Sequence, residues 1–192
     1  MYFYIHSFSH QTPVIMRVNL KLMLVFLISL LCIFSFHSCK KEKNVSDMEK
    51  STDKQLYDMS KSTAGFTWFK NSDVLLNKSS GSAHPQSFLR TRYNSTAATK
   101  LDGAGRIMNG VSFPEGSLIV KELFESTTNL VRYAILYKKS DSPDADARGW
   151  VWGYINADGV IVESASKKGS SCISCHSQNG NIDYMLMNKF FP

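Results

Sequence analysis

The apolar positions of the chain form one long run near the N-terminus, at residues 22–36. Arg17 and Lys21 precede this run of fifteen residues. A helix that spans a bilayer needs about 20 apolar residues, so the run is better suited to the hydrophobic region of an export signal. Residues 1–38 are therefore predicted to be a signal peptide. Met16 is an alternative start, in which case residues 1–15 would not be translated.

After residue 65 the pattern changes to short runs rich in β-branched and aromatic residues, separated by turn-forming clusters. The predicted strands are residues 65–69, 87–93, 117–124, 130–138, 150–156 and 160–162. Connections such as 127–129 and 142–144 are too short for crossover helices, and Asp158-Gly159 is typical of a tight hairpin. The sequence therefore predicts a mainly β (α+β) fold, with an antiparallel sheet and a few short helices.

The predicted helices are short. Residues 39–64 are charged, with Leu56 and Met59 as a thin apolar edge, and are predicted to be a tether with a short helix. One or two helical turns are predicted over 94–101, capped by Asn94 or Ser95. Residues 65–192 are then predicted to form one folded domain.

A C-x-x-C-H motif, formed by Cys172, Cys175 and His176, stands sixteen residues from the C-terminus. Two cysteines at this spacing can form thioether bonds to one haem, and the adjacent histidine can bind its iron. A thioredoxin-like redox pair and half of a zinc site are the alternatives. The first is expected early in a βαβ unit, and the second needs two further ligands. The motif therefore predicts one covalently attached haem c near the C-terminus, with iron as the metal.

The end of the apolar run, at residues 36–39, resembles the lipobox of bacterial lipoproteins. This resemblance implies cleavage before Cys39 and acylation of its sulfur, and therefore a lipid anchor on the periplasmic side of a membrane or on the cell exterior. A plain signal peptide or a short uncleaved anchor are the alternatives. After cleavage the remaining cysteines and histidines are Cys39, Cys172, Cys175, His84 and His176.

The charge of the chain argues against a nucleic-acid partner. The formal net charge is +6, and residues 1–38 carry two of the basic side chains and no acidic ones. No basic stripe is interleaved with aromatic residues, so we expect no nucleic-acid binding.

Candidates for a second iron ligand are few. In small electron-transfer cytochromes c the haem motif lies near the N-terminus, and a methionine far downstream completes the coordination of the iron. Here Met185 and Met187 follow His176 too closely in sequence to reach the opposite side of the haem. Upstream, His84 lies in the predicted polar loop 78–86, and Met108 is also poorly placed. We therefore expect five-coordinate iron with an open distal side, which binds small ligands or acts on them.

Four segments resemble the cytochrome P-460 family and its relative cytochrome c-prime-beta: residues 113–123, 149–153, 172–176 and 183–184. The resemblance implies a mainly antiparallel β-sheet, a c-type haem near the C-terminus, and commonly a homodimer. The P-460 branch oxidises hydroxylamine, and the c-prime-beta branch binds nitric oxide or similar gases.

The resemblance also assigns a role to Lys121, because the P-460 branch bonds a lysine at this place to the haem rim. By strand alternation Lys121 shares a face with Ile119 and Leu123, and burial without a counter-charge would make its amine nucleophilic. The alternative is an ion pair with a carboxylate and no haem bond.

A distal group should separate the two branches. The P-460 branch places a carboxylate above the iron, but residues 130–137 contain none, and Tyr133 is nearest to that position. A phenol is a poor base at neutral pH. Phe124 would instead cap the iron as an aromatic residue does in the gas-binding branch.

Three functions therefore stay open at this point. The first is an enzyme that oxidises hydroxylamine or another small nitrogen compound, and the second is a non-enzymatic haem protein that binds nitric oxide. The third is an electron carrier, which needs His84 or Met108 as a second iron ligand. The sequence does not identify a redox partner.

Overall fold

The computed structural model describes residues 51–192. The predicted signal peptide, Cys39 and the first part of the predicted tether lie outside the described residues. Within residues 51–192 no helix is both long enough and apolar enough to cross a membrane.

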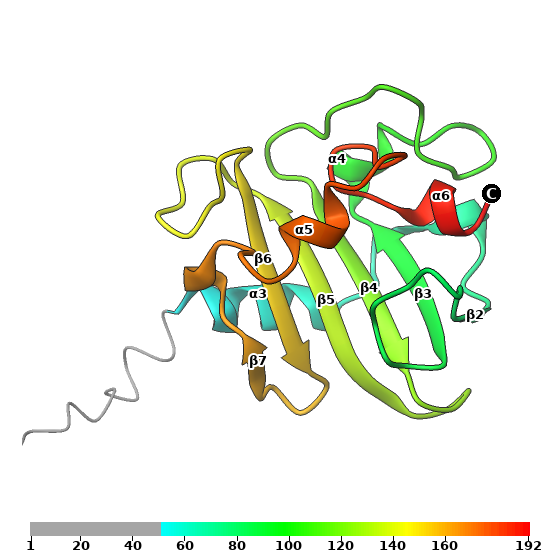
Figure 1. The fold of residues 1–192 in the computed structure, drawn as a ribbon, viewed down its shortest axis with the longest axis horizontal. Helices are drawn as coiled ribbons and strands as arrows, with labels where there is room; N and C mark the ends of the chain where they lie inside the picture. The colour runs from blue at the N-terminus through cyan, green and yellow to red at the C-terminus, as the bar shows by residue number, and fades with distance from the viewer. Residues whose placement is uncertain (1–50) are drawn as a thin grey trace, which may run out of the picture. The chain divides into compact units, whose positions relative to one another are not determined.

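One antiparallel sheet organises the described part of the chain (Figure 1). Its strand order is β1-β3-β4-β5-β6-β7, and β2 also pairs with β3. The strands are β1 (Thr67–Trp68), β2 (Leu76–Asn77), β3 (Phe88–Tyr93), β4 (Leu118–Phe124), β5 (Leu130–Lys138), β6 (Trp150–Asn156) and β7 (Ile161–Glu163). The helices are α3 (Thr52–Lys61), α4 (Ser95–Ala98), α5 (Ile173–His176) and α6 (Met187–Phe190), with 3-10 turns at Phe69–Asn71 and Ala165–Lys167.

The mainly β, antiparallel fold predicted from the sequence is confirmed. Strands β3 to β7 form where β-branched and aromatic residues recur, and β5 and β6 have the predicted bounds. Asn94 caps α4, because its side chain accepts a hydrogen bond from the Ala97 N–H at 2.9 Å. Strand β2 was not predicted, because two residues are too few to show an alternating pattern.

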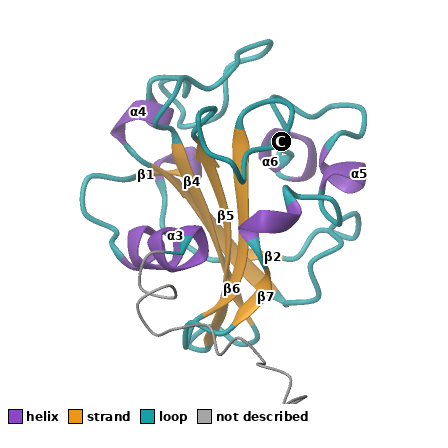
Figure 2. Cartoon of the chain, turned by 90° about the vertical axis from the view of Figure 1, so that its left-hand side faces the viewer, coloured by secondary structure: helices purple, strands orange, loops and turns teal. Residues whose placement is uncertain are grey.

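The two faces of the sheet are covered differently. Figure 2 shows α3 on one side of the strands and α5 and α6 on the other. Leu56 of α3 is 1% exposed and packs with Val120 and Ile155 beneath the sheet. Full burial of a leucine side chain stabilises a fold by about 2 kcal/mol. Helix α3 therefore belongs to the core of the molecule, although its sequence shows only a thin apolar edge.

Strand alternation decides which side chains face the C-terminal helices. Ile119 and Leu123 of β4 join the core cluster that includes Trp150, Trp152 and Tyr184. Lys121 shares their parity and therefore their face. The opposite face of β4 carries Glu122, which is 3% exposed and forms ion pairs with Arg90 and Arg92. The site described below lies on the first of these faces.

Candidate haem-binding site

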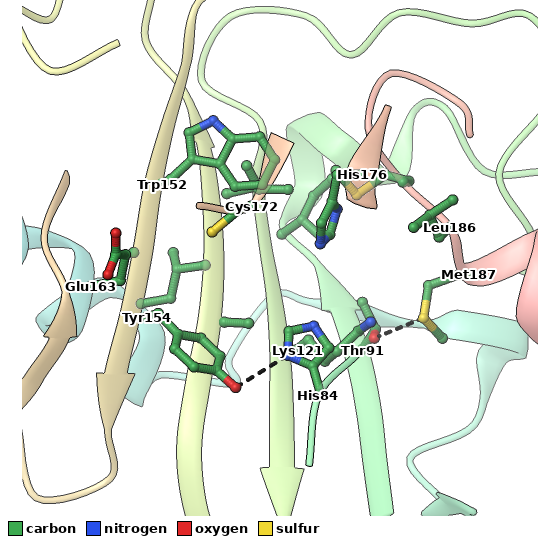
Figure 3. Close-up of a pocket in the computed structure, with 16 residues that line it drawn as sticks. His84, Thr91, Lys121, Trp152, Tyr154, Glu163, Cys172, His176, Leu186 and Met187 are labelled. Carbon is green, nitrogen blue, oxygen red and sulfur yellow. Dashed lines mark hydrogen bonds between the residues drawn. The ribbon is translucent and has the colours of Figure 1, made fainter. Parts of the chain in front are cut away.

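A cavity lies between the Lys121 face of the sheet and the C-terminal segment that carries the C-x-x-C-H motif (Figure 3). It consists of an inner pocket of about 60 Å³ and an adjoining outer pocket of about 340 Å³. Both pockets are lined by His84, Lys121, Tyr154, Glu163, Cys172, His176 and Leu186. The inner pocket adds the apolar residues Ile119, Ala134, Leu136, Trp152, Met185 and Met187. Apolar walls with a few converging polar groups are typical of small-molecule and cofactor sites.

His176 ends helix α5 with its ring in the cavity. Its Nδ1 lies 2.8 Å from the Tyr184 carbonyl oxygen. A carbonyl can only accept, so Nδ1 donates and Nε2 keeps its lone pair. The Trp152 ring packs edge-to-face against the imidazole at 5.2 Å. Burial, partly opposed by the hydrogen bond to Tyr184, lowers the His176 pKa to about 4, so the ring is neutral. A neutral, oriented Nε2 is what a metal ion requires from a histidine ligand.

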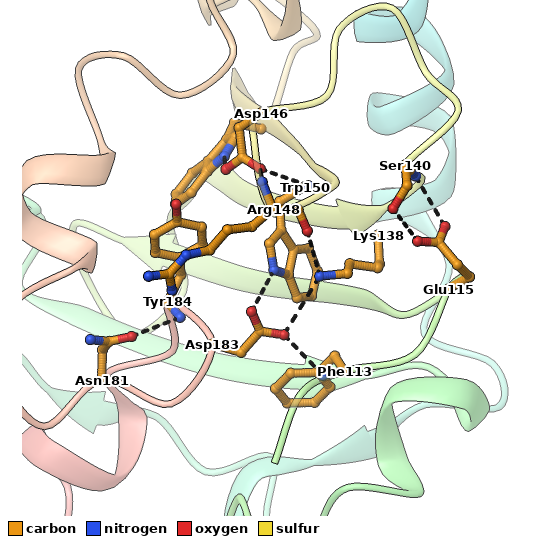
Figure 4. Close-up of polar contacts among 11 residues, drawn as sticks. Phe113, Glu115, Lys138, Ser140, Asp146, Arg148, Trp150, Asn181, Asp183 and Tyr184 are labelled. Atoms are coloured by element: carbon orange, nitrogen blue, oxygen red, sulfur yellow. Dashed lines mark hydrogen bonds and ion pairs between the residues drawn. The ribbon is translucent and has the colours of Figure 1, made fainter. Parts of the chain in front are cut away.

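The Tyr184 carbonyl is held in place by an unusual turn (Figure 4). Asp183 and Tyr184 both have positive φ values, 46° and 72°, which residues other than glycine rarely adopt. The Asp183 carboxylate accepts hydrogen bonds from Trp150 Nε1 at 3.1 Å and from the Phe113 N–H at 2.9 Å. These contacts join three distant segments, so the orientation of His176 depends on Asp183 through the Tyr184 carbonyl.

The two motif cysteines are free thiols beside the same cavity. Cys172 borders both pockets, and Cys175 is exposed and borders the outer one. Burial raises the pKa of Cys172, and its sulfur lies 3.6 Å from the Ser171 hydroxyl. Among residues 51–192 no three or more His, Cys, Asp or Glu side chains are grouped so that they could hold a metal ion.

Lys121 brings an amine into the middle of this apolar wall. The Lys121 side chain is half-buried and has no hydrogen bond or ion pair to any of the described residues. Burial alone lowers its pKa to about 8. Its neighbours along the strand ladder are Thr91 and Ala134, which carry no charge. The ion pair considered as an alternative from the sequence is therefore not formed within the described part of the chain.

His84 lies in the cavity, and the expectation that it would be poorly placed is wrong. Its ring centroid is 6.3 Å from that of His176, and its Nδ1 lies 3.2 Å from the Tyr154 hydroxyl. Burial, together with the neighbouring Lys121 and His176, lowers the His84 pKa to about 3. The loop between β2 and β3 folds over the pocket, and sequence alternation cannot predict where a loop folds.

The two distal candidates from the sequence, Tyr133 and Phe124, do not line the cavity, which corrects their expected position. Tyr133 has the opposite strand parity from Ala134 and packs against Tyr57 of α3 at 6.3 Å. The Phe124 ring packs beside Arg90 at 5.4 Å. Both side chains point to the α3 side because neighbouring residues in a strand face opposite ways.

Some residues of the cavity were not predicted from the sequence. Met185 and Met187 line its inner end, and the Thr91 hydroxyl donates to the Met187 sulfur at 3.3 Å. Both methionines follow His176 too closely in sequence to bind the iron on its other side. This argument does not prevent them from lining the cavity. Met108 is 36% exposed and is not among the residues that line the cavity.

The residues present fit a c-type haem. Two free thiols stand at the rim of an apolar cavity, and the adjacent histidine presents an unprotonated Nε2 because a carbonyl holds its other nitrogen. Cys172 and Cys175 would carry the thioether bonds, and His176 would bind the iron. This is the placement that the motif predicted from sequence.

Comparison with known proteins supports the same conclusion. The family described as Cytochrome P460 matches residues 67–187, which include β1 to β7, α5 and the C-x-x-C-H motif. No curated protein and no solved structure matches the chain. Since the family match covers more than half of the chain and the site has the residues that a c-type haem requires, the chain belongs to the cytochrome P460 family of c-type haem proteins.

Proposed function

We propose that this protein carries one haem, bonded through Cys172 and Cys175 with His176 on the iron, and oxidises hydroxylamine or a similar small nitrogen compound. When bound, the haem supplies an iron site for a small ligand and a path for electrons. The observation that carries the proposal is the unpaired Lys121 amine, which shares the cavity with Cys172 and His176.

Lys121 is suited to form a covalent bond to the haem edge. With a pKa of about 8, about a tenth of the amine is neutral at pH 7, far more than for an ordinary lysine, and its lone pair is nucleophilic. A bond from this nitrogen to a porphyrin carbon would replace one N–H and one C–H bond by a C–N bond, and would release two protons and two electrons. A peroxide can accept both and be reduced to water.

Hydroxylamine oxidation releases protons, which side chains of the cavity have to accept. The described wall contains His84 and Tyr154, which are hydrogen-bonded to each other at 3.2 Å. Glu163 also lines both pockets, but its carboxylate already accepts hydrogen bonds from the Ser171 hydroxyl and the Lys167 amine. Because the His84 pKa is about 3, this ring can take up such a proton only transiently and has to pass it on to solvent.

A second candidate function is binding of nitric oxide or a similar gas without turnover. Strand β5 favours this function. It matches the strand that carries the distal carboxylate in the P-460 branch, but it instead presents Ala134 and Leu136 to the cavity. An apolar wall suits a neutral diatomic ligand, and it offers no base.

The Lys121→Leu variant tests the proposal. Purified wild-type protein should have a red-shifted reduced Soret band, haem that stays attached after thioether cleavage, and turnover of hydroxylamine with an artificial electron acceptor. The variant should keep its haem through the cysteines but show an ordinary c-type spectrum and at least about tenfold slower turnover, equivalent to about 1.4 kcal/mol. A wild type with an ordinary spectrum that binds nitric oxide and does not turn over hydroxylamine would support the gas-binding function instead.

We also propose that the protein is exported and anchored by an acyl chain on Cys39. Support comes from the apolar run at residues 22–36 and the lipobox-like residues 36–39 that follow it. Each buried methylene of an acyl chain contributes about 0.8 kcal/mol, so two or more chains hold a protein at a membrane. The resemblance to the family adds the proposal of a homodimer.

A further inference from the structure

His84 and His176 face each other across the cavity. Their ring centroids are 6.3 Å apart and their planes make an angle of 73°. Figure 3 shows the His176 ring above the His84 ring. In each ring Nδ1 has a hydrogen-bond partner, the Tyr184 carbonyl for His176 and the Tyr154 hydroxyl for His84. The Nε2 atom of each ring has no hydrogen-bond partner among the described residues and is therefore free for a ligand.

The separation of the rings suits two imidazoles bound to a single metal ion. An imidazole nitrogen binds a transition metal at about 2 Å, so two such rings on opposite sides have centres about 6 Å apart. A histidine that only exchanged protons with a ligand on the iron would have to stand farther away, because the ligand occupies the space between. From this geometry we propose that His84 is the second axial ligand of the haem iron, opposite His176. This proposal rests on the haem attachment in the proposed function, and it replaces the five-coordinate iron expected from the sequence by a six-coordinate one.

The loop that carries His84 is shaped to reach the cavity. Its base is closed by the Lys78 N–H, which donates to the Ser87 carbonyl at 2.8 Å. At Gly81 the loop passes so close to α6 that a Cβ would lie 2.5 Å from the Phe190 ring. A larger residue at 81 would have to displace either the Phe190 ring or the loop, so glycine allows the close approach. His84 is thus placed by loop closure and by contact with the C-terminal helix.

The hydrogen bond to Tyr154 fixes the form of His84 that can bind iron. Coordination through Nε2 requires Nδ1 to carry the proton, so Nδ1 donates and the Tyr154 oxygen accepts. The Arg132 guanidinium lies 4.6 Å from the Tyr154 ring centre and packs on its face. Tyr154 is therefore a positioning residue for His84, as the Tyr184 carbonyl is for His176.

Ligation by His84 changes how a small molecule reaches the iron. With both axial positions held by imidazoles, nitric oxide or hydroxylamine binds only after His84 leaves. The loop can release it, because His84 lies within a surface loop while His176 is tied to the covalently attached motif. The apparent affinity for any external ligand is then reduced by the fraction of molecules in which His84 is released.

The visible absorption and electron paramagnetic resonance spectra of the purified, haem-loaded protein test the proposal without an activity assay. Wild type should be low-spin. His84→Ala should be high-spin, should return to low-spin when free imidazole is added, and should bind nitric oxide about tenfold faster or more. Met108→Ala is the matched control. Met108 was the other upstream candidate ligand, and because it lies outside the cavity this variant should stay low-spin.

Two results would overturn the proposal. A high-spin wild type would show that His84 does not bind iron, whether or not any variant folds. A low-spin His84→Ala protein would show that another side chain holds the sixth position. The test is separate from that of the proposed function, since protein without covalent haem refutes both, whereas haem-loaded, low-spin protein that never turns over hydroxylamine refutes only the enzyme.

Discussion

Two cations on strands β3 and β4, one buried and one half-buried, are accommodated in different ways. Arg92 is fully buried, pairs with Glu122 and donates to the Ser60 carbonyl of α3, so its charge is compensated. Lys121, one position from Glu122 but on the other face, has no counter-charge among the described residues. A cation removed from water without a counter-charge, such as the Lys121 amine, lowers stability and becomes more reactive. A paired cation, such as the Arg92 guanidinium, mainly fixes the position of the element that it contacts.

The stability cost of Lys121 should show in the pH dependence of folding. Its folded-state pKa of about 8 lies below the ordinary 10.5, so the unfolded chain binds the proton more tightly. Stability should therefore be reduced below pH 8 and should rise between pH 8 and pH 10.5. In a Cys172→Ser, Cys175→Ser background, which leaves the amine free of haem, the free energy of unfolding should gain about 1 kcal/mol from pH 7 to pH 9.

The matched control is Lys121→Met in the same background, which should lack this gain. Denaturant unfolding at the two pH values measures both proteins. An equal pH dependence in the two would show that the Lys121 amine is solvated or paired in the folded state.

At the residue scale, prediction from sequence succeeded for residues whose role depends on their near neighbours in sequence. It failed for residues whose position depends on contacts between distant segments. The C-x-x-C-H spacing is local, so Cys172, Cys175 and His176 could be assigned to one site. Strand alternation placed Lys121 correctly beside Ile119. The face of Tyr133 depends on which side of the sheet holds the cavity, and the position of His84 depends on loop closure. Neither is encoded in a local period.

At the element scale, the turn after α5 connects the haem motif to the sheet. Asp183 and Tyr184 occupy left-handed backbone conformations that cost of order 1 kcal/mol or more each. The turn persists because the Asp183 carboxylate satisfies two buried donors, Trp150 Nε1 and the Phe113 N–H. Helices α5 and α6 have four residues each, too short for a helical period to show in the sequence.

Replacing Asp183 by alanine should loosen both the fold and the iron ligand. Two buried donors lose their acceptor, which costs about 1–3 kcal/mol each, so the free energy of unfolding should fall by at least about 2 kcal/mol. The hydrogen bond from His176 to Tyr184 should weaken, and the haem reduction potential should shift. Denaturant unfolding and a spectroscopic redox titration measure the two effects. Asp141→Ala, at an exposed carboxylate paired with Lys139, should change neither by a measurable amount. An Asp183→Ala protein with unchanged stability and potential would contradict the positioning role.

At the scale of the whole molecule, the two faces of the sheet have different roles: one forms the packed core with α3, and the other forms the cavity. One face packs against α3 through Leu56 and the Arg92–Glu122 pair, and the other forms the cavity with the C-terminal segment. Because β3, β4, β5 and β6 pair along most of their lengths, the wall that carries Lys121 and Ala134 is rigid. The loop with His84 and the motif both border this cavity, so the site is complete only after both segments have packed against the sheet.

The export and anchoring of the molecule make the last prediction. If Cys39 is the acylated residue, Cys39→Ala should move the protein from the membrane fraction to the soluble fraction while leaving its haem spectrum unchanged, because Cys172 and Cys175 hold the cofactor. Cys32→Ala is the matched control, since Cys32 lies within the apolar run and leaves with the signal peptide, so this variant should stay in the membrane fraction. Fractionation followed by mass spectrometry of the mature N-terminus measures both outcomes. A Cys39→Ala protein that remains in the membrane with residues 22–36 intact would instead show an uncleaved N-terminal anchor.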